Sequence, residues 1–392
     1  MQAQQKNFLS VIKSGLNNNP FDISPEFDGD EAILTAMHHH LDILFYYGAK
    51  KSKVSLSEGS FAVLQKRVIM LASLDARQEL EIKKLYKSFN NEDIQYMPLK
   101  GAIIKEYYPS PEMRYMGDID VLVNPSQYKK IKTIMENMGF AFVVESDHEY
   151  VWEKKNTLRV ELHKRLIPSY NEDFYDYYND GWHLAKEKTE NGYVMTDEDF
   201  LIYIFTHLAK HYRDGGVGIK HFVDLWVYMS EKPELDYTYI ESELAKLDLF
   251  TFYKNVLKML DVWFCGADDT EMSDFLTEWI FSGGAYGSKE NIETSNAVKQ
   301  TKKHKNLKNI KISLFVEKIF PSAKALSNKY PILRKSSILL PLVWIVRLVD
   351  AILFRKEDIK NTQSKINNLE EKTLTDYEKA LEFVGLNFNF KE

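Results

Sequence analysis

Two aspartates separated by one residue, Asp118 and Asp120, are the side chains with the clearest capacity for chemistry in this sequence. They alternate with the apolar residues Ile119 and Val121, a pattern typical of a strand. Because side chains alternate along a strand, the two carboxylates share one face while Ile119 and Val121 point into a core. Neighbouring carboxylates repel each other, and a bound cation relieves that repulsion. The pair therefore indicates a divalent-cation site.

A third acid, Glu161, follows about forty residues later, between Val160 and Leu162. These two apolar residues are expected to face the core, so Glu161 and His163 share the opposite face. If this strand lies beside the Asp118 strand, three carboxylates can hold two divalent ions about 4 Å apart. Mg²⁺ suits such a site because it prefers carboxylate and phosphate oxygens. For His163, contact with phosphate, orientation of a metal ligand and a structural role all remain open.

Basic residues precede the aspartates. Lys100 lies beside Gly101 at the end of an expected strand, where a lysine is well placed to bind phosphate. Arg114 has two candidate roles: it contacts a triphosphate, or it pairs with Asp118 or Asp120 and holds the loop. The sequence contains neither the P-loop pattern nor the dinucleotide-binding glycine pattern.

Two groups of histidines are weaker candidates. His207 and His211 are four residues apart, a spacing compatible with metal binding on one helix face. Further ligand motifs are missing, so structural or substrate-facing roles are expected for them and for Asp224. The run His38–His40 is expected to form a polar helix face, and the glycine-rich stretch Ser282–Ser288 a loop.

The elements that must position these residues form a small α/β unit between helical regions. The clearest N-terminal helix runs from Phe61 to Phe89, because its apolar residues recur at helical spacing. Helices are expected again from Asp199 onward, and Glu357–Phe383 is expected to be one charged helix. Strands are expected at Ile94–Leu99, Asp118–Val123, Phe140–Glu145, Tyr150–Lys154 and Arg159–Leu166.

These elements predict an α+β protein, in which a small mixed sheet of about five strands is flanked by N-terminal helices and a large C-terminal helical region. A chain of 392 residues is long enough for roughly two to three domains. The predicted parts are an N-terminal helical region at 1–90, an α/β core at 91–198, a helical domain completing a cleft at 199–288, a polar basic linker at 289–310 and a C-terminal helical region at 311–392.

Charge is distributed unevenly along the chain. The whole sequence carries a net charge of −6, but residues 299–356 contain 14 Lys and Arg against two acids, a net charge of +12. The rest of the chain therefore carries −18. Such asymmetry indicates either an acidic partner, such as RNA or a membrane surface, or a solvated basic face.

The apolar stretch 338–354 carries Arg347 and Asp350, and it is about one residue short of the length expected for a spanning helix. We expect a buried core helix there in preference to an interfacial membrane helix, and we expect no membrane span. The N-terminus lacks the long apolar segment of a signal peptide, and the single cysteine, Cys265, has no intrachain partner. Both features favour the cytoplasm.

The motifs L-K-G, R-Y-M-G-D-I-D-V-L-V and V-E-L-H, spread over roughly 94–166, resemble those of the bacterial uncharacterised nucleotidyltransferase family. That family belongs to the DNA-polymerase-β-like nucleotidyltransferase superfamily. The flanking segments are similar more loosely: a helical lead-in, the region of His207, His211 and Asp224, and a glycine loop with Y-G.

The resemblance implies roles for individual residues. Asp118 and Asp120 match the paired metal-binding acids, and Glu161 matches the third carboxylate, which positions or deprotonates the acceptor hydroxyl. Gly101 matches the glycine that lets the backbone approach the triphosphate. Many members of the superfamily have Gly-Ser at this turn, whereas this chain has Gly101-Ala102 and offers no hydroxyl. Lys100 is expected to supply a positive charge instead.

The function expected from these residues is Mg²⁺-dependent transfer of a nucleoside monophosphate from an NTP, such as ATP, to an acceptor, with release of pyrophosphate. Lys100, Gly101, Arg114 and His163 are the expected nucleotide-binding residues. The acceptor stays open among a small molecule, RNA and protein. The alternative is a non-catalytic module with the same fold that binds RNA or a protein through 299–356.

Overall fold

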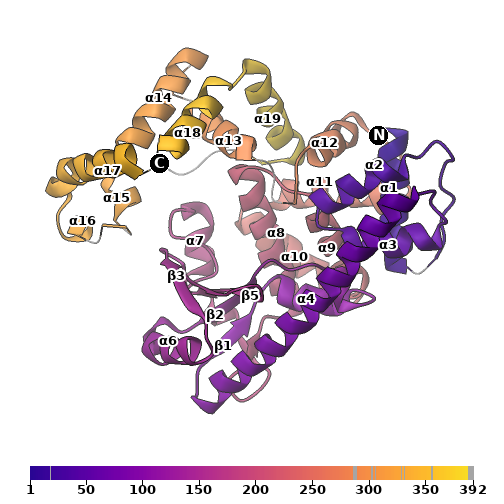
Figure 1. The fold of residues 1–392 in the computed structure, drawn as a ribbon, viewed down its shortest axis with the longest axis horizontal. Coiled ribbons are helices and arrows are strands. Elements are labelled where there is room, and N and C mark those ends of the chain that lie inside the picture. The colour runs from indigo at the N-terminus through magenta and orange to yellow at the C-terminus, as the bar shows by residue number, and fades with distance from the viewer. Residues whose placement is uncertain are drawn as a thin grey trace.

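A computed structural model describes residues 1–17, 19–285, 289–301, 303–304, 306–327, 329–330, 332–354 and 356–386 of the protein. Most of these residues are helical, and a mixed β-sheet of five strands lies to one side of the main group of helices (Figure 1). This arrangement confirms the predicted α+β fold, with helical regions before and after the sheet.

The sheet has the strand order β1-β2-β5-β4-β3. Strands β2 and β5 are parallel, and the other neighbours are antiparallel. All five predicted strands are present, with bounds that differ by a few residues, and β2 is buried along its whole length. The strands are β1 (Tyr96–Pro98), β2 (Ile119–Val123), β3 (Ala141–Glu145), β4 (Glu149–Lys154) and β5 (Leu158–His163).

Short helices connect the strands of the sheet. Helix α5 (Gly101–Ile104) follows β1, and α6 (Tyr128–Asn137) follows β2. Because α5 contacts both β2 and helix α9, the turn at Lys100 lies between the sheet and the helices that follow it in the chain.

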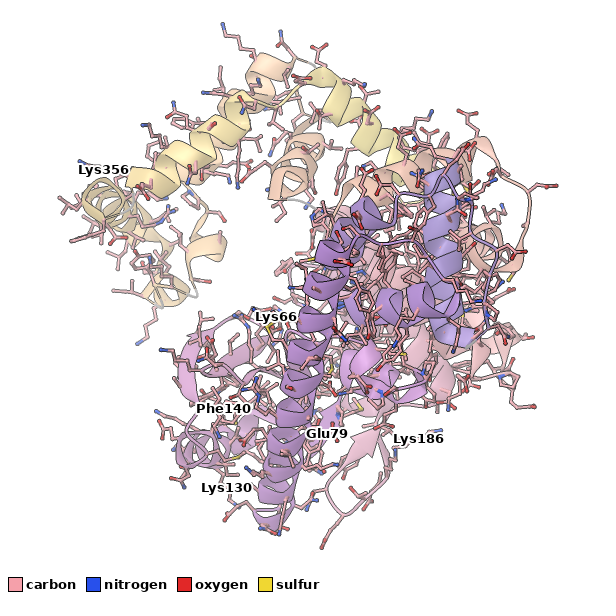
Figure 2. All side chains as sticks on the ribbon, turned by 45° about the vertical axis from the view of Figure 1, so that its right-hand side comes forward. Lys66, Glu79, Lys130, Phe140, Lys186 and Lys356 are labelled. Carbon is pink, nitrogen blue, oxygen red and sulfur yellow. The ribbon has the colours of Figure 1, made fainter. Side chains whose placement is uncertain are left out.

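Four helices precede the sheet, and the longest, α4, joins the two large hydrophobic cores of the molecule. Leu64 in its N-terminal part is buried in the core of the helical regions, and Leu85 in its C-terminal part is buried in the core of the sheet. Figure 2 shows α4 crossing the front of the molecule, with Lys66 and Glu79 labelled along it. The four helices are α1 (Ala3–Asn17), α2 (Gly29–His38), α3 (Asp42–Lys51) and α4 (Glu58–Asn91).

The prediction that His38–His40 forms a polar helix face is wrong for His39, which is completely buried in the turn after α2. The Nδ1 atom of His39 accepts a hydrogen bond from the Ile219 N–H at 3.2 Å, and its Nε2 donates to the Phe281 carbonyl at 3.3 Å. A polar ring whose two nitrogens both find backbone partners is buried without leaving an unsatisfied group. His39 thereby links α2 to the start of α9 and the end of α12.

The helices after the sheet form the largest part of the hydrophobic core. Thr196 caps the first long helix, α8, because its side chain accepts a hydrogen bond from the backbone N–H of Asp199. This region contains α7 (Glu172–Tyr178), β6 (Lys186–Glu187), β7 (Tyr193–Val194), α8 (Asp197–Asp214), α9 (Ile219–Ser230), α10 (Tyr237–Lys246), α11 (Phe250–Leu260) and α12 (Glu271–Ser282).

The stretch 289–310, predicted to be a polar linker, contains helix α13 (Lys289–Thr301) and the start of α14 (Leu307–Ile319). Helix α13 packs against α8, α14 and α19, and it buries Ala297 and Val298. Helix α13 is therefore held in place by a narrow buried face, although most of its residues are polar. The predicted loop Ser282–Ser288 lies partly outside the described residues, which leave out 286–288.

The predicted single helix Glu357–Phe383 is two helices, α18 (Lys356–Asn367) and α19 (Glu371–Val384). Helix α19 packs against α11, α12 and α13, and the Tyr377 hydroxyl donates a hydrogen bond to the Tyr212 carbonyl of α8 at 2.6 Å. The break between the helices lets α19 return to the main body.

The prediction of a buried core helix at 338–354 is also wrong. Helix α17 (Leu340–Phe354) is present, but many of its apolar side chains are exposed. Helices α14 to α18, which we call the C-terminal arm, project together from one side of the molecule (Figure 1). Too few elements surround α17 to bury it on all sides. The arm also contains α15 (Ala323–Leu326) and α16 (Ile332–Lys335). No helix in the described part of the chain is long and apolar enough to cross a membrane.

Candidate active site

The parallel pairing of β2 and β5 places Asp120 directly opposite Glu161. Two residues further along this pair, Leu122 lies opposite His163. One ligand atom from each of Asp120, Glu161 and His163 lies within 4.8 Å of the other two. Asp118 precedes β2 by one residue and is partly exposed. Among the described residues it belongs to no such compact group of ligands, so it stands at the edge of this cluster.

Asp120 is the most enclosed acid of the cluster, and two side chains share one of its oxygens. Its Oδ1 accepts a hydrogen bond from Lys100 Nζ at 2.6 Å and another from His163 Nε2 at 2.8 Å. Burial disfavours the carboxylate, but the Lys100 ammonium and the His163 hydrogen bond outweigh burial and hold the pKa of Asp120 well below its usual range. Lys100 therefore lies in the site as predicted, with its charge turned toward Asp120.

The two partners of Asp120 differ in how their protons respond to burial. Burial works against the charged form of Lys100, but the charge of Asp120 is stronger and raises the pKa of Lys100 above its usual value. For His163, the effect of burial is larger than that of the hydrogen bond to Asp120, so the pKa of the ring is lowered. The ring is then neutral, and its buried Nδ1 has no hydrogen-bond partner among the described residues. A buried unpaired nitrogen of this kind is a potential ligand atom.

The pKa of Glu161 is shifted upward, opposite to that of Asp120. Burial is the largest cause that raises its pKa to about 7, and the carboxylates of Glu149, Asp120 and Asp118 add to it. Arg159 Nε lies 3.2 Å from Glu161 Oε1, so the two side chains form an ion pair. That arginine is 44% exposed, however, and it does not offset the surrounding negative charge.

A second possible ligand group shares His163 and adds two residues that the sequence did not single out, His148 and Glu149. His148 Nε2 lies 3.2 Å from Glu149 Oε2. Burial raises the pKa of Glu149, but the hydrogen bond and charge of His148 are stronger and bring it to about 2. The site therefore contains ionised carboxylates on β4 as well as on β2.

This donor set fits a divalent cation. Its members are carboxylates and imidazoles, which are ligands for Mg²⁺ and for transition metals respectively. The pKa of Asp118 is raised by burial and then by Asp120, which means that the protein alone leaves repulsion among these acids. A cation between the carboxylates would remove that repulsion.

Arg114 has a partner that the sequence did not predict, Asp224. Its guanidinium makes a two-pronged contact with Asp224 of α9, at 2.8 Å from Nη2 to Oδ2 and 3.1 Å from Nε to Oδ1. The Tyr108 hydroxyl donates to the same carboxylate at 2.7 Å. The contact ties the loop before β2 to the helical region. The position of Arg114 also explains why residue 101 is a glycine, because a Cβ there would lie 2.3 Å from Arg114 Nη1.

The cluster lines a cavity of about 400 Å³ between the sheet and helices α8 and α9. The residues around this cavity belong to a segment that matches a known protein family. A family model described as an uncharacterised nucleotidyltransferase matches residues 25–265, which is more than half of the chain. The chain belongs to this family. No curated protein and no solved structure matches it.

The match confirms the family that the sequence motifs indicated. In this nucleotidyltransferase-family chain, the matched residues run from before α2 to shortly after α11, and they include every residue of the cluster as well as Arg114 and Asp224. The C-terminal arm lies outside the match.

The wall of the cavity opposite the acids is rich in nitrogen atoms from α8 and α9. Lys210, Lys220 and His221 line it, together with the predicted His207 and His211. The Nε2 atoms of His207 and His211 are 2.8 Å apart, so one ring donates to the other. Burial lowers the pKa of both rings well below the usual value, and they face the cavity in neutral form.

Lys220 is the least accessible of the cationic side chains on this wall. Burial, with the nearby Arg114 guanidinium second, lowers its pKa to about 7. Sequence reasoning missed Lys210 and Lys220. Lys210 lies three residues after His207, and this helical spacing was a usable signal. Lys220 offered none, because only the packing of α9 against α5 brings it to the site.

Proposed function

We propose that the protein is a Mg²⁺-dependent nucleotidyltransferase that moves a nucleoside monophosphate from an NTP to an acceptor and releases pyrophosphate. The observation that carries the proposal is the pairing of β2 with β5, which sets Asp120 opposite Glu161 in the wall of a cavity. The family to which the chain belongs supports nucleotidyl transfer in general. The metal, the NTP donor and the acceptor are parts of our proposal.

Asp118, Asp120 and Glu161 are the residues that would hold Mg²⁺. When bound, the ion supplies positive charge that neutralises the phosphates and favours the oxyanion of the acceptor. His163 positions Asp120 through its hydrogen bond to Oδ1, and it thereby fixes the direction of the second carboxylate oxygen.

The triphosphate would lie between the acids and the cationic wall. Lys210 and Lys220 face the cavity from α8 and α9, and Lys100 with Gly101 borders it from the turn after β1. A lysine ammonium in a partly closed site binds a phosphate oxygen more strongly than it does in water. Arg114 acts indirectly in this scheme, because its contact with Asp224 holds the loop that carries Asp118.

Glu161 is the proposed base. The acceptor oxygen would attack the α-phosphorus, and the bond from that phosphorus to the bridging oxygen of the β-phosphate would break. Pyrophosphate leaves with the electron pair of the broken bond, and a Glu161 carboxylate oxygen takes the proton of the acceptor hydroxyl.

The proposal is tested by incubating the protein with each α-labelled NTP, Mg²⁺ or Mn²⁺, and separate pools of cell RNA, protein and small metabolites. We expect label in one pool, which identifies the class of acceptor. Asp120→Asn should abolish labelling, since the amide removes a ligand charge. Asp236→Asn is the matched control, because Asp236 caps α10 away from the cavity and asparagine caps equally well.

Two results would count against the proposal. Full labelling by a folded Asp120→Asn protein would exclude the carboxylate site as the catalytic centre, with circular dichroism as the check on folding. No labelling with any NTP would instead favour the non-catalytic module that binds RNA or protein through 299–356.

A further inference from the structure

Helix α17 presents a continuous apolar face to solvent. Five aliphatic side chains at helical spacing share this face, and each is between 50% and 63% exposed. Arg347 lies on the other side of the helix, and Asp350 borders the stripe and is only partly exposed, so no charged residue lies within the stripe. We call the five side chains the α17 stripe: Leu342, Ile345, Val346, Val349 and Leu353.

The other side of α17 is anchored within the C-terminal arm. The indole Nε1 of Trp344 donates to the Pro321 carbonyl at 2.9 Å, and its ring meets Phe320 edge-on at 5.1 Å between centroids. Val343 is buried in a small cluster with Leu326 and Leu333. Because these contacts fix the rotation of the helix, the stripe is held outward. Exposed apolar surface of this extent on an ordered element marks an interaction site.

The surroundings of the stripe are strongly basic. Most of the arm falls within 299–356, a stretch that carries +12, whereas the rest of the chain carries −18. Lys308, Lys329, Lys335 and Lys356 are all exposed, and the last two bracket α17 in the sequence. Figure 2 shows Lys356 on the arm, far across the view from Glu79 on α4.

We propose that the C-terminal arm binds the surface of an anionic membrane, with the α17 stripe lying in the plane of the interface. An apolar helix face combined with cationic surroundings is the recognised pattern for interfacial binding. A helix of 15 residues is about 22 Å long, shorter than the roughly 30 Å hydrocarbon core, so α17 lies along the surface. The charge of the two parts sets the orientation, because the acidic body is repelled by the lipids that attract the arm.

Two other occupants of the stripe fit the same observations less well. RNA binds through cationic and aromatic side chains, and the stripe contains neither. A second copy of the chain would bring two basic arms together, and these repel each other. Of these three occupants, the anionic bilayer is the one that matches both the aliphatic stripe and its basic surroundings.

The test is flotation of the full-length protein with vesicles of phosphatidylcholine, with and without about 30% phosphatidylserine. We expect the protein to float with the anionic vesicles only, and less at high salt. Ile345→Asp/Val349→Asp should weaken binding at least tenfold, because it places two charges on the stripe. Leu34→Asp/Ile69→Asp is the matched control on α2 and α4, where both side chains are more than 60% exposed, and it should bind like the natural chain.

Several results would overturn the proposal. These are no flotation of the natural chain, flotation with neutral vesicles alone, or equal loss in the control variant. RNA binding without flotation would reassign the arm to nucleic acid. A dimer seen by light scattering that the stripe variant abolishes, again without flotation, would reassign the stripe to self-association. Flotation needs no nucleotidyl transfer, so its outcome and that of the labelling experiment are separate.

Discussion

Asp120 shows how the candidate site is balanced at the level of single residues. One of its oxygens accepts hydrogen bonds from Lys100 and His163, and these stabilise its buried negative charge. The negative charges of Asp118 and Glu161 are stabilised less, and the pKa of each carboxyl is raised by burial first and by neighbouring carboxylates second. A site with surplus negative charge should gain stability when a cation binds.

Mg²⁺ should therefore stabilise the folded protein. At a concentration ten times the dissociation constant, one site contributes about 1.4 kcal/mol, which raises the melting temperature by a few degrees. Thermal unfolding with increasing MgCl₂ measures the shift, with Asp120→Asn as the comparison. An equal shift in both proteins would mean that the ion binds elsewhere.

Arg114→Met should destabilise the protein by about 3 to 5 kcal/mol, because it leaves the buried carboxylate of Asp224 without its two-pronged partner. Lys232→Met removes an ion pair with Asp197 whose carboxylate is 49% exposed, and it should cost less than about 1 kcal/mol. Urea unfolding of both variants gives the comparison. If both variants lose a similar free energy of unfolding, the contact between Arg114 and Asp224 stabilises the protein no more than an exposed ion pair does.

At the scale of elements, His39 joins three helices that are far apart in the chain. Its Nδ1 must be unprotonated to accept from Ile219, and its Nε2 must carry the proton donated to Phe281. Burial lowers the pKa of His39 to about 4, with the charges of His38 and His40 as further, smaller causes. The junction of α2, α9 and α12 therefore requires a neutral ring.

This requirement predicts a pH dependence of stability. The folded pKa lies below the unfolded value of about 6.5, so the unfolded chain binds more protons and stability falls as pH drops from 7 toward 4. Between pH 7 and pH 5 the loss from His39 is about 2 kcal/mol. His39→Gln keeps a donor and an acceptor without titrating, so denaturant unfolding should show a shallower pH slope. The exposed His183→Gln control should keep the natural slope.

At the scale of the whole molecule, charge separates into two parts that the fold keeps apart. The family-matched body contains the cavity, and the basic arm lies outside the match. At about 0.1 M salt the Debye length is about 10 Å, so each part interacts with its surroundings largely on its own. The net charge of −6 is therefore a poor guide to the behaviour of the protein.

A protein of net charge −6 should accordingly be retained on a cation-exchange resin at about 0.1 M salt and released as ionic strength rises. Two variants of equal net charge test whether the arm is responsible. The arm variant changes three exposed lysines to glutamine, at Lys308, Lys329 and Lys335. The body variant makes the same change at Lys66, Lys87 and Lys130. The arm variant should elute first, and co-elution would contradict the prediction.

The sequence also predicted a good part of the candidate site. Alternation around Asp118 and Asp120 placed both on a strand, and the same pattern around Glu161 indicated a second strand beside it. Local rules of this kind reach only a few residues. Asp224 and Lys220 contribute to the site from α9, more than a hundred residues after Lys100, so no local pattern could assign their partners.

By itself, the sequence determined the α+β class, the five strands, the acidic motif and the family, because these depend on local periodicity and on short motifs. Only the tertiary structure decided that Lys100 pairs with Asp120, that Arg114 pairs with Asp224, and that α17 is exposed. The physical reason is that burial and pairing depend on which distant elements meet. An apolar helix is buried only if enough of the chain packs around it, and the C-terminal arm leaves one side of α17 uncovered.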